Sequence, residues 1–370
     1  MAGLTLLSDA ERLDWVRLAR TSSIGPVTFA SLLSRFGSAK AALDALPGLA
    51  RRAGRKRKLV IPDTDEVRAE IDATQAYGAR LVAHCEPDYP QLLRMVDPPP
   101  PILTISGSPA LFESKAVAIV GARNASAAGR KITRDIAGAL GQAGFIIVSG
   151  LALGIDGEAH GASLATGTVA VLGGGINHIY PRQHDNLYHA IREQGAIVSE
   201  SPFGHQATAR DFPRRNRIIT GLCLGTIVVE AAERSGSLIS ARTANEQGRE
   251  VMAVPGSPLE PRAQGTNRLI REGATLVRSP DDVLEVLGML GQTQLQMPNP
   301  PLFEDEEPAL QFPEDQISAV YQALSLTPLP IDEIARAAGL GSVRCAAILV
   351  ELELSERAVT LSGGLAMRAL

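Results

Sequence analysis

Cysteine is scarce in this chain of 370 residues, which has only Cys85, Cys223 and Cys345. The three are far apart in the sequence and none belongs to a CxxC pair. Disulfide frameworks and thiolate zinc sites both need paired or closely spaced cysteines. The sequence therefore predicts free thiols and no structural metal, as is typical of a reducing cytoplasm.

Long hydrophobic runs are also absent, since no apolar stretch reaches the roughly 18 residues that a membrane span requires. The amino terminus lacks the basic-then-apolar order of a signal peptide. We therefore expect a cytoplasmic protein with no membrane partner. An apolar fraction of 45% is enough to fill hydrophobic cores, and the length predicts two or three domains.

Catalytic signatures are missing as well. The chain has no GxSxG elbow, no Ser, His and acid set, and no histidines at metal-ligand spacing. His160, His178, His184 and His189 are interpreted as polar structural residues. The turn GARNAS is not the GxGxxG of a dinucleotide site. We therefore expect neither an enzyme nor a bound cofactor.

What the sequence does contain is a repeated order of apolar run, glycine turn and helical stretch. Runs of Val, Ile and Ala without alternation indicate strands that are buried on both faces, and hence a mostly parallel sheet. This pattern predicts a doubly wound α/β domain. The six predicted strands are 116–121, 145–150, 168–175, 196–200, 226–230 and 251–256.

Helical spacing dominates the first part of the chain, which we predict to be a helical domain over 1–85. Its turn Ile24–Pro26 has two open interpretations: a helix-hairpin-helix turn that binds DNA phosphates, or a plain structural turn, which we favour. The basic run Arg51–Lys58 either contacts nucleic acid or stays solvated. The sheet domain is expected over 86–290 and a Pro-, Gln- and acid-rich linker over 291–313.

The last part, 314–370, is predicted to be a winged-helix domain with three short helices, the second of which ends at Gly339. Residues 301–370 contain four arginines and eleven acidic residues, whereas residues 116–279 contain seventeen Lys and Arg residues against thirteen acidic residues. The third helix offers Arg344 as its cation, so it is a poor candidate for reading a DNA groove. We therefore favour a protein contact for this domain.

The most informative stretch is DFPRRNRIITG, Asp211–Gly221, which we expect to be a loop. It gathers Arg214, Arg215, Arg217, Phe212 and Asn216. Such a cluster is either a solvated face or a site where phosphates and a stacked base are bound. Because open α/β sheets bind ligands at the carboxyl ends of their strands, we favour the nucleic-acid site.

Four glycine or serine turns follow predicted strands, and together they predict a wide anion groove. The first, Gly121–Ser126, opens a helix whose dipole attracts anions together with Arg123. In the second, Ser149–Ala162, either Ser149 or Asp156 can cap the next helix. The third, Gly173–Pro181, permits close backbone approach, and the fourth, Glu233–Ala241, begins another helix.

Five stretches, taken in order, resemble the DNA processing protein A family, also called Smf. They are VAIVGARNAS, VSGLALGIDGEAH, VAVLGGGINHIYP, FPRRNRIITGL and VVEAAERSGSLISARTANEQGREVMAVPG. The resemblance implies an extended Rossmann-like domain, a sterile-alpha-motif-like helical front and a winged-helix end. It also implies a homodimer without catalytic turnover, which binds single-stranded DNA and loads the recombinase RecA during natural transformation. The DNA-binding residues implied are Gly121, Arg123, Ser149, Gly150, Phe212, Arg214, Arg215, Asn216, Arg217, Gly236 and Ser237.

One enzyme class remains as the alternative, the Rossmann-like nucleoside-monophosphate phosphoribohydrolases, whose glycine turn is similar to ERSGSLISA. In that group a catalytic carboxylate follows the turn, whereas this chain has Ser240 at the equivalent position and no acid until Glu246. Glycosidic cleavage without that carboxylate loses its main catalyst. The sequence thus favours a binding protein.

Overall fold

The structure is a computed structural model that describes residues 4–52, 59–293, 312–355, 357–361 and 364–369. The chain forms two compact units, one from Met1–Ala69, Asp97–Pro101 and Pro300–Leu370, the other from Glu70–Val96 and Ile102–Asn299. Most of the predicted linker and residues 53–58 of the basic run lie outside the described residues. Within the described part of the chain, no helix is long and apolar enough to cross a bilayer.

Helical spacing at the amino terminus produces the helices that the sequence predicts. A capping box fixes the first of them, because Ser8 N donates to Glu11 Oε2 and Glu11 N donates to Ser8 Oγ. Gly37, at φ +73°, ends the second in the left-handed conformation. The helices are α1 (Asp9–Arg20), α2 (Pro26–Phe36), α3 (Ala39–Arg52) and α4 (Thr64–Ala76).

The carboxy-terminal residues fold as the predicted winged helix, with a three-stranded sheet in the order β10-β12-β11. Gly339, at φ +68°, stops the second helix as expected. Val320, Ile334 and Ile348 are part of its buried core. Its elements are α13 (Glu314–Ala323), β10 (Leu329–Pro330), α14 (Ile331–Ala338), α15 (Ser342–Leu354), β11 (Ala358–Leu361) and β12 (Leu365–Arg368).

The second unit is built on a nine-stranded sheet in the order β1-β2-β6-β5-β4-β3-β7-β8-β9. The strands from β6 to β9 in this order are parallel, and β1 and β2 extend one edge in antiparallel pairing. All six predicted strands are therefore confirmed. The strands are β1 (Arg80–Ala83), β2 (Ile102–Gly107), β3 (Ala116–Val120), β4 (Ile146–Ser149), β5 (Thr168–Leu172), β6 (Ala196–Ser199), β7 (Gly225–Val228), β8 (Glu250–Ala253) and β9 (Thr275–Leu276).

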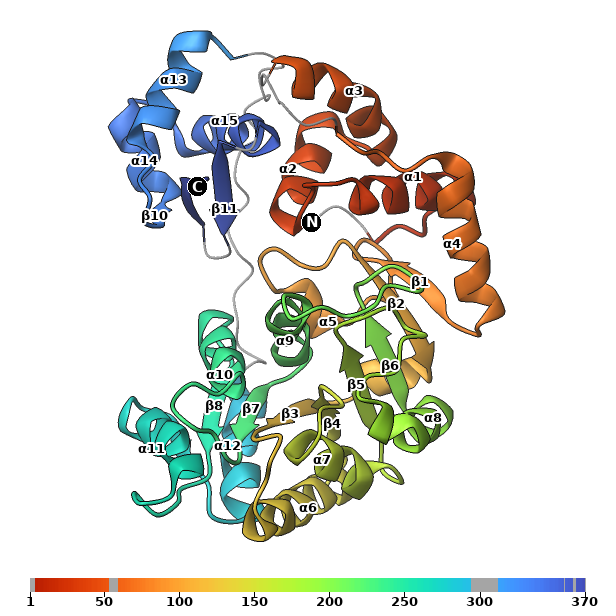
Figure 1. The fold of residues 1–370 in the computed structure, drawn as a ribbon, viewed down its shortest axis with the longest axis vertical. Helices are drawn as coiled ribbons and strands as arrows, with labels where there is room; N and C mark the ends of the chain where they lie inside the picture. Colours follow the sequence, from red (N-terminus) through yellow and green to blue (C-terminus); the bar gives the residue numbers. More distant parts are fainter. Residues whose placement is uncertain (1–3, 53–58, 294–311, 356, 362–363, 370) are drawn as a thin grey trace. The chain divides into compact units, whose positions relative to one another are not determined.

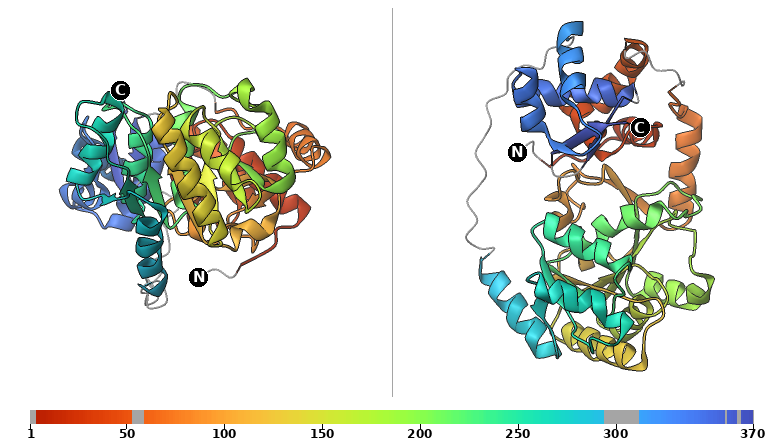
Figure 2. Two further views of the ribbon diagram at one scale, coloured as in Figure 1. Left: turned by 90° about the horizontal axis from the view of Figure 1, so that it is seen from below. Right: turned by 60° about the vertical axis from the view of Figure 1, so that its left-hand side comes forward.

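Helices cover both faces of this sheet, because alternate strand residues are buried on opposite sides. Val117 and Ile119 pack with one apolar cluster, whereas Ala118 and Val120 pack with another. Helices α6 and α7 lie side by side (Figures 1 and 2). The helical segments are α5 (Gln91–Arg94), η1 (Pro109–Phe112), α6 (Ala127–Gln142), α7 (Ile155–Ser163), η2 (Arg182–His184), α8 (Asp185–Gln194), α9 (Asp211–Gly221), α10 (Ser237–Glu246), η3 (Pro261–Ala263), α11 (Gln264–Arg271) and α12 (Pro280–Thr293).

The direction of winding reverses between β3 and β7. The chain runs outward from β3 to β6 and then returns to place β7 on the other side of β3. In open α/β sheets, ligands bind in the crevice that this reversal creates at the carboxyl ends of the strands. The crevice here lies after Val120 and Val228, which are paired in register.

Two expectations need correction. The sheet begins with β1 at Arg80, before the boundary placed between residues 85 and 86, because a four-residue strand is too short to show as a pattern. The stretch Asp211–Gly221 is helix α9 rather than a loop. Pro213 is tolerated there because it occupies the first turn, where its missing N–H has no helical acceptor. Buried Ile218 and Ile219 then hold the helix against the sheet.

Candidate nucleic-acid interface

A cavity of about 510 Å³ opens at the reversal point of the sheet. The residues after β3, the first turn of α10 and one face of α9 line it. This volume falls in the range of small-molecule and cofactor sites. The predicted site residues among its walls are Gly121, Arg123, Phe212, Arg215, Asn216, Gly236 and Ser237.

An aromatic and cationic cluster forms one side of the cavity. The guanidinium carbon of Arg123 lies 5.6 Å from the ring centroid of Phe212, and the ring of Tyr180 lies 5.4 Å from the same ring. Arg123 is exposed and Tyr180 is 47% exposed. The arrangement offers a flat apolar surface beside a positive charge, which suits a stacked base and its phosphate. Tyr180 was not predicted as a site residue, although it lies within the third glycine turn, Gly173–Pro181.

The start of α10 forms the opposite side. Gly236 precedes this helix without any side-chain cap, and the space beside its Cα is open. The ten-residue helix directs its positive end at this space, so an anion is favoured there. Ser235 Oγ accepts from Ser237 N at 3.3 Å, and the Ser235 carbonyl accepts from Leu238 N at 3.1 Å. The first amides of α10 therefore have partners within their own turn, and the open space lies beside Gly236.

The start of α6, by contrast, is already filled by a side chain of the protein. Ser126 N and Ser126 Oγ donate to the two carboxylate oxygens of Glu230, at 2.9 and 2.5 Å. A Cβ at Gly129 would lie 2.6 Å from the Glu230 carboxyl carbon. The external anion predicted at this helix start is therefore wrong, because an internal carboxylate takes that place. Arg123 and Gly121 still line the cavity.

The second turn is covered by Arg215. Ser149 is fully buried and its hydroxyl donates to the Ile119 carbonyl, so it does not face the cavity. The guanidinium of Arg215 covers Gly150, whose carbonyl accepts from Arg215 Nη1 at 2.8 Å. Asp156 does not cap α7 at its start; its carboxylate accepts from the amides of Gly150 and Ala152 in the preceding turn. Ser149 and Gly150 are thus structural residues here.

Arg215 itself is buried, with 8% of its surface exposed. Its Nη1 also donates to the Val171 carbonyl. Burial lowers the pKa of Arg215 to about 10 despite the opposing charge of Asp156, and burial raises the pKa of Asp156 despite Arg215. Because its Nη1 donates to backbone carbonyls, Arg215 supports the cavity floor instead of making the predicted phosphate contact.

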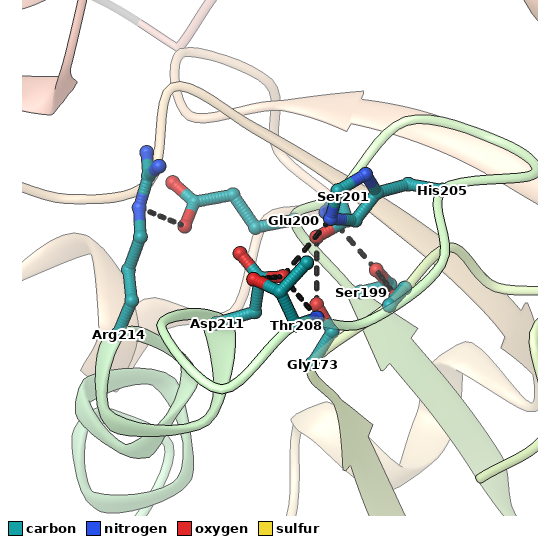
Figure 3. A network of polar contacts seen from close by, with 9 residues as sticks. Gly173, Ser199, Glu200, Ser201, His205, Thr208, Asp211 and Arg214 are labelled. Carbon is teal, nitrogen blue, oxygen red and sulfur yellow. Dashed lines mark hydrogen bonds and ion pairs between the residues drawn. The ribbon is translucent and has the colours of Figure 1, made fainter.

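The other two arginines of α9 lie off the cavity and share one carboxylate. Arg214 Nε lies 3.7 Å from Glu200 Oε2 (Figure 3). Arg217 Nη2 lies 2.5 Å from Glu200 Oε1. Arg217 is mostly covered, whereas the Arg214 side chain is 57% exposed. The cluster seen in the sequence is therefore split, because successive helical residues point in different directions.

Residues 200–210, which join β6 to α9, fill the third glycine turn. Ser201 Oγ donates to the Gly173 carbonyl at 2.9 Å (Figure 3). Gly175 N donates to the His205 carbonyl at 2.8 Å. A Cβ at Gly174 would lie 2.9 Å from the His205 carbonyl oxygen. The segment 200–210 of the same chain therefore occupies the space that these glycines leave free. His205 Nε2 and Asp211 Oδ2, 3.1 Å apart, tie this segment to α9.

His160 is a buried structural residue, as predicted. Its Nδ1 lies 2.7 Å from Thr168 Oγ1, which itself donates to the Ile147 carbonyl, so the ring nitrogen is the donor. Burial lowers the pKa of His160 to about 3, and the charges of His184 and Arg215 act in the same direction. The ring is neutral in the folded protein at neutral pH.

Acid is therefore expected to destabilise the protein through His160. The unfolded imidazole has a pKa near 6.5, so below that pH only the unfolded state takes up the proton, and stability is lost as the pH falls toward 3. Urea unfolding should show a loss of about 2 kcal/mol near pH 5 relative to neutral pH. His160→Gln should remove this pH dependence, whereas exposed His189→Gln should retain it. An equal pH profile for both variants would contradict the assignment.

Comparison with known proteins agrees with this architecture. The family model for DNA recombination-mediator protein A matches residues 80–288, a DprA-like N-terminal HHH domain matches 9–73, and a DprA winged helix domain matches 304–364. Protein Smf of Synechocystis is 33% identical over 94% of this chain and 96% of its own length. Protein Smf of Escherichia coli is 41% identical over 74% of this chain and 73% of its own.

Solved structures show the same fold. DNA processing protein A from Streptococcus pneumoniae superposes with a TM-score of 0.61 at 32% identity, over 76% of this chain and 98% of its own. The Helicobacter pylori protein, whose structure concerns its single-stranded DNA binding mode, gives 0.53 at 27% identity, over 57% of this chain and 96% of its own. On these matches, the chain belongs to the DNA processing protein A family, also called Smf.

Proposed function

We propose that the cavity binds single-stranded DNA without cleaving it. The observation that carries this proposal is the meeting of Arg123, Phe212 and Tyr180 with the open space at Gly236, the start of α10, at one opening. A base stacks on the rings, and the neighbouring phosphates lie at Arg123 and at the positive end of α10 beside Gly236. Because every base has an aromatic face, such binding tolerates any sequence.

The roles of the predicted residues follow from their positions. Arg123, Phe212, Asn216, Gly236 and Ser237 face the strand directly. Arg214 is exposed on the neighbouring side of α9 and offers a further phosphate contact along the strand. Gly121 leaves room for Ile155, because a Cβ there would lie 2.6 Å from Ile155 Cγ1. Ser149, Gly150 and Arg215 support the cavity walls, and Arg217 is paired with Glu200 beside them.

We further infer a role in recombination, in which a cytoplasmic homodimer protects incoming strands and loads RecA during natural transformation. Support comes from the family model, which describes a recombination mediator. Absence of turnover is part of the proposal: the one carboxylate in the cavity wall, Asp156, already accepts two backbone amides, and Ser240 occupies the position of the acid used by phosphoribohydrolases. Incubation with nucleoside monophosphates should release no free base.

Salt dependence is the direct test of the binding site. We expect the full chain to bind a fluorescent single strand more tightly than the matching duplex. The logarithm of its affinity should fall with the logarithm of salt at a slope of roughly −0.7 per phosphate contacted. Anisotropy titrations over a series of salt concentrations measure both. Equal affinity for duplex, or a slope near zero, would remove the basis for the site.

A further inference from the structure

The turn that follows β3 carries Arg123 and is held by segments far away in the chain. Arg262 Nε on η3 donates to the Asn124 carbonyl at 2.9 Å. Ile155 N, at the first residue of α7, donates to the Ala122 carbonyl at 3.2 Å. The backbone on both sides of Arg123 is therefore fixed, whereas the Arg123 side chain is exposed.

A third hold on this turn comes from Glu230, the second residue after β7. Its carboxylate accepts from Ser126 N at 2.9 Å and from Ser126 Oγ at 2.5 Å, so each oxygen has a donor on the same residue. Ser126 Oγ in turn accepts from Gly129 N in the first turn of α6, at 2.9 Å. Because charge-assisted contacts at two points fix orientation as well as distance, Glu230 joins the end of β7 firmly to the start of α6.

The backbone beside Glu230 is itself anchored on the sheet. Val229 N donates to the Val120 carbonyl at the end of β3, at 3.1 Å, and Ala231 N donates to the Arg262 carbonyl at 2.7 Å. The carboxylate of Glu230 therefore extends from a fixed point of the sheet. What it holds is the end of the turn that begins after Val120.

The position of this turn matters because Arg123 reaches the cavity from it. The Arg123 guanidinium carbon lies 5.6 Å from the centroid of the Phe212 ring, close to the limit of about 6 Å within which a cation and a ring attract each other. A small displacement of the turn therefore separates the two groups. We propose that Glu230 is a positioning residue for single-strand binding, which holds the Arg123 side chain beside Phe212. This inference rests on the proposed function of the cavity.

The negative charge of Glu230, taken alone, predicts the opposite effect, because removing an acid from a phosphate-binding region favours anion binding. Two substitutions separate the charge from the contacts. Glu230→Gln removes the charge and keeps both contacts, since the amide oxygen accepts from Ser126 N and the amide nitrogen donates to Ser126 Oγ. Glu230→Ala removes the same charge together with both contacts.

Anisotropy titrations of the full chain with a fluorescent single strand test the positioning role. Glu230→Ala should weaken binding by about two- to fivefold, typical of the loss of an exposed ion pair, whereas Glu230→Gln should bind at least as tightly as wild type. In the Arg123→Ala background, Glu230→Ala should cause no further loss, because the group that it positions is gone. Tighter binding by Glu230→Ala, an equal loss in Glu230→Gln, or the same loss in both backgrounds overturns the proposal.

Hydrogen exchange measured by mass spectrometry tests the hold on the turn without DNA. Peptides that cover residues 121–129 should exchange faster in Glu230→Ala and as slowly as wild type in Glu230→Gln, while the rest of the sheet unit is unchanged. Unchanged exchange at 121–129 in Glu230→Ala overturns the hold. Ser126→Ala removes one of the two contacts, so it should give an intermediate result, and it replaces Glu230→Ala if that variant does not fold.

The same titrations separate this inference from the function on which it rests. Normal binding by Arg123→Ala contradicts the proposed function of the cavity and removes the positioning role with it. Weakened binding by Arg123→Ala together with normal binding by Glu230→Ala contradicts the positioning role alone.

Discussion

Replacing Arg215 with methionine is expected to lower the free energy of unfolding by about 2 to 6 kcal/mol, because each of the two buried carbonyls that loses its donor costs about 1 to 3 kcal/mol. The change leaves the Asp156 carboxylate buried without its opposing charge and leaves the carbonyls of Gly150 and Val171 without a donor. Urea unfolding followed by circular dichroism measures the loss. Arg214→Met, at a side chain that is 57% exposed, is the control and should cost less than about 1 kcal/mol.

The pH dependence of this loss identifies its cause. Burial already raises the pKa of Asp156, and removing Arg215 raises it further above the unfolded value. The Asp156 carboxyl of the folded variant then stays protonated to a higher pH. The loss of unfolding free energy relative to wild type should therefore be small in mild acid and grow as the pH rises. Arg215→Met/Asp156→Asn should recover much of the loss. A stable Arg215→Met protein that merely fails to bind DNA would return Arg215 to the phosphate role.

Truncation of Phe212 should have the largest single effect on binding. Phe212→Ala removes the ring that lies between Arg123 and Tyr180, and base stacking is worth about 1 to 3 kcal/mol, or about 5- to 150-fold in affinity. Arg123→Ala should weaken binding less, and its salt slope should be shallower by about 0.7. Both are measured by anisotropy with a fluorescent single strand.

Two comparisons make these binding results specific. Arg242→Ala removes a cation from α10 that is 83% exposed and paired with Glu246, outside the cavity wall, so it should bind as wild type does. The melting temperature of Phe212→Ala should stay within a few degrees of wild type, because this side chain is only partly buried. If Phe212→Ala and Arg123→Ala both bind normally, the strand does not use this cavity.

Patterns with a strong local cause were predictable from the sequence. Continuous apolar runs such as Ala116–Val120 form strands because both of their faces are buried, and Gly37 and Gly339 end helices because they adopt a left-handed backbone conformation. The structure brings Arg123, Phe212 and Gly236 of the predicted set to one cavity, and their binding role stays a prediction. The environment of each neighbouring residue was not predictable in the same way, because successive residues of α9 point to different sides of the helix.

The parallel sheet, the helical amino-terminal domain, the winged-helix domain and the family were all evident from the amino-acid sequence, because hydrophobic periodicity and glycine turns act over a few residues. Long-range contacts settle what lies at each turn. Glu230 fills the start of α6, Arg215 covers Gly150, and residues 200–210 occupy the third turn, whereas the space beside Gly236 at the start of α10 is open. These partners lie many residues apart in the chain, so no local pattern indicates that a charge is already neutralised inside the fold.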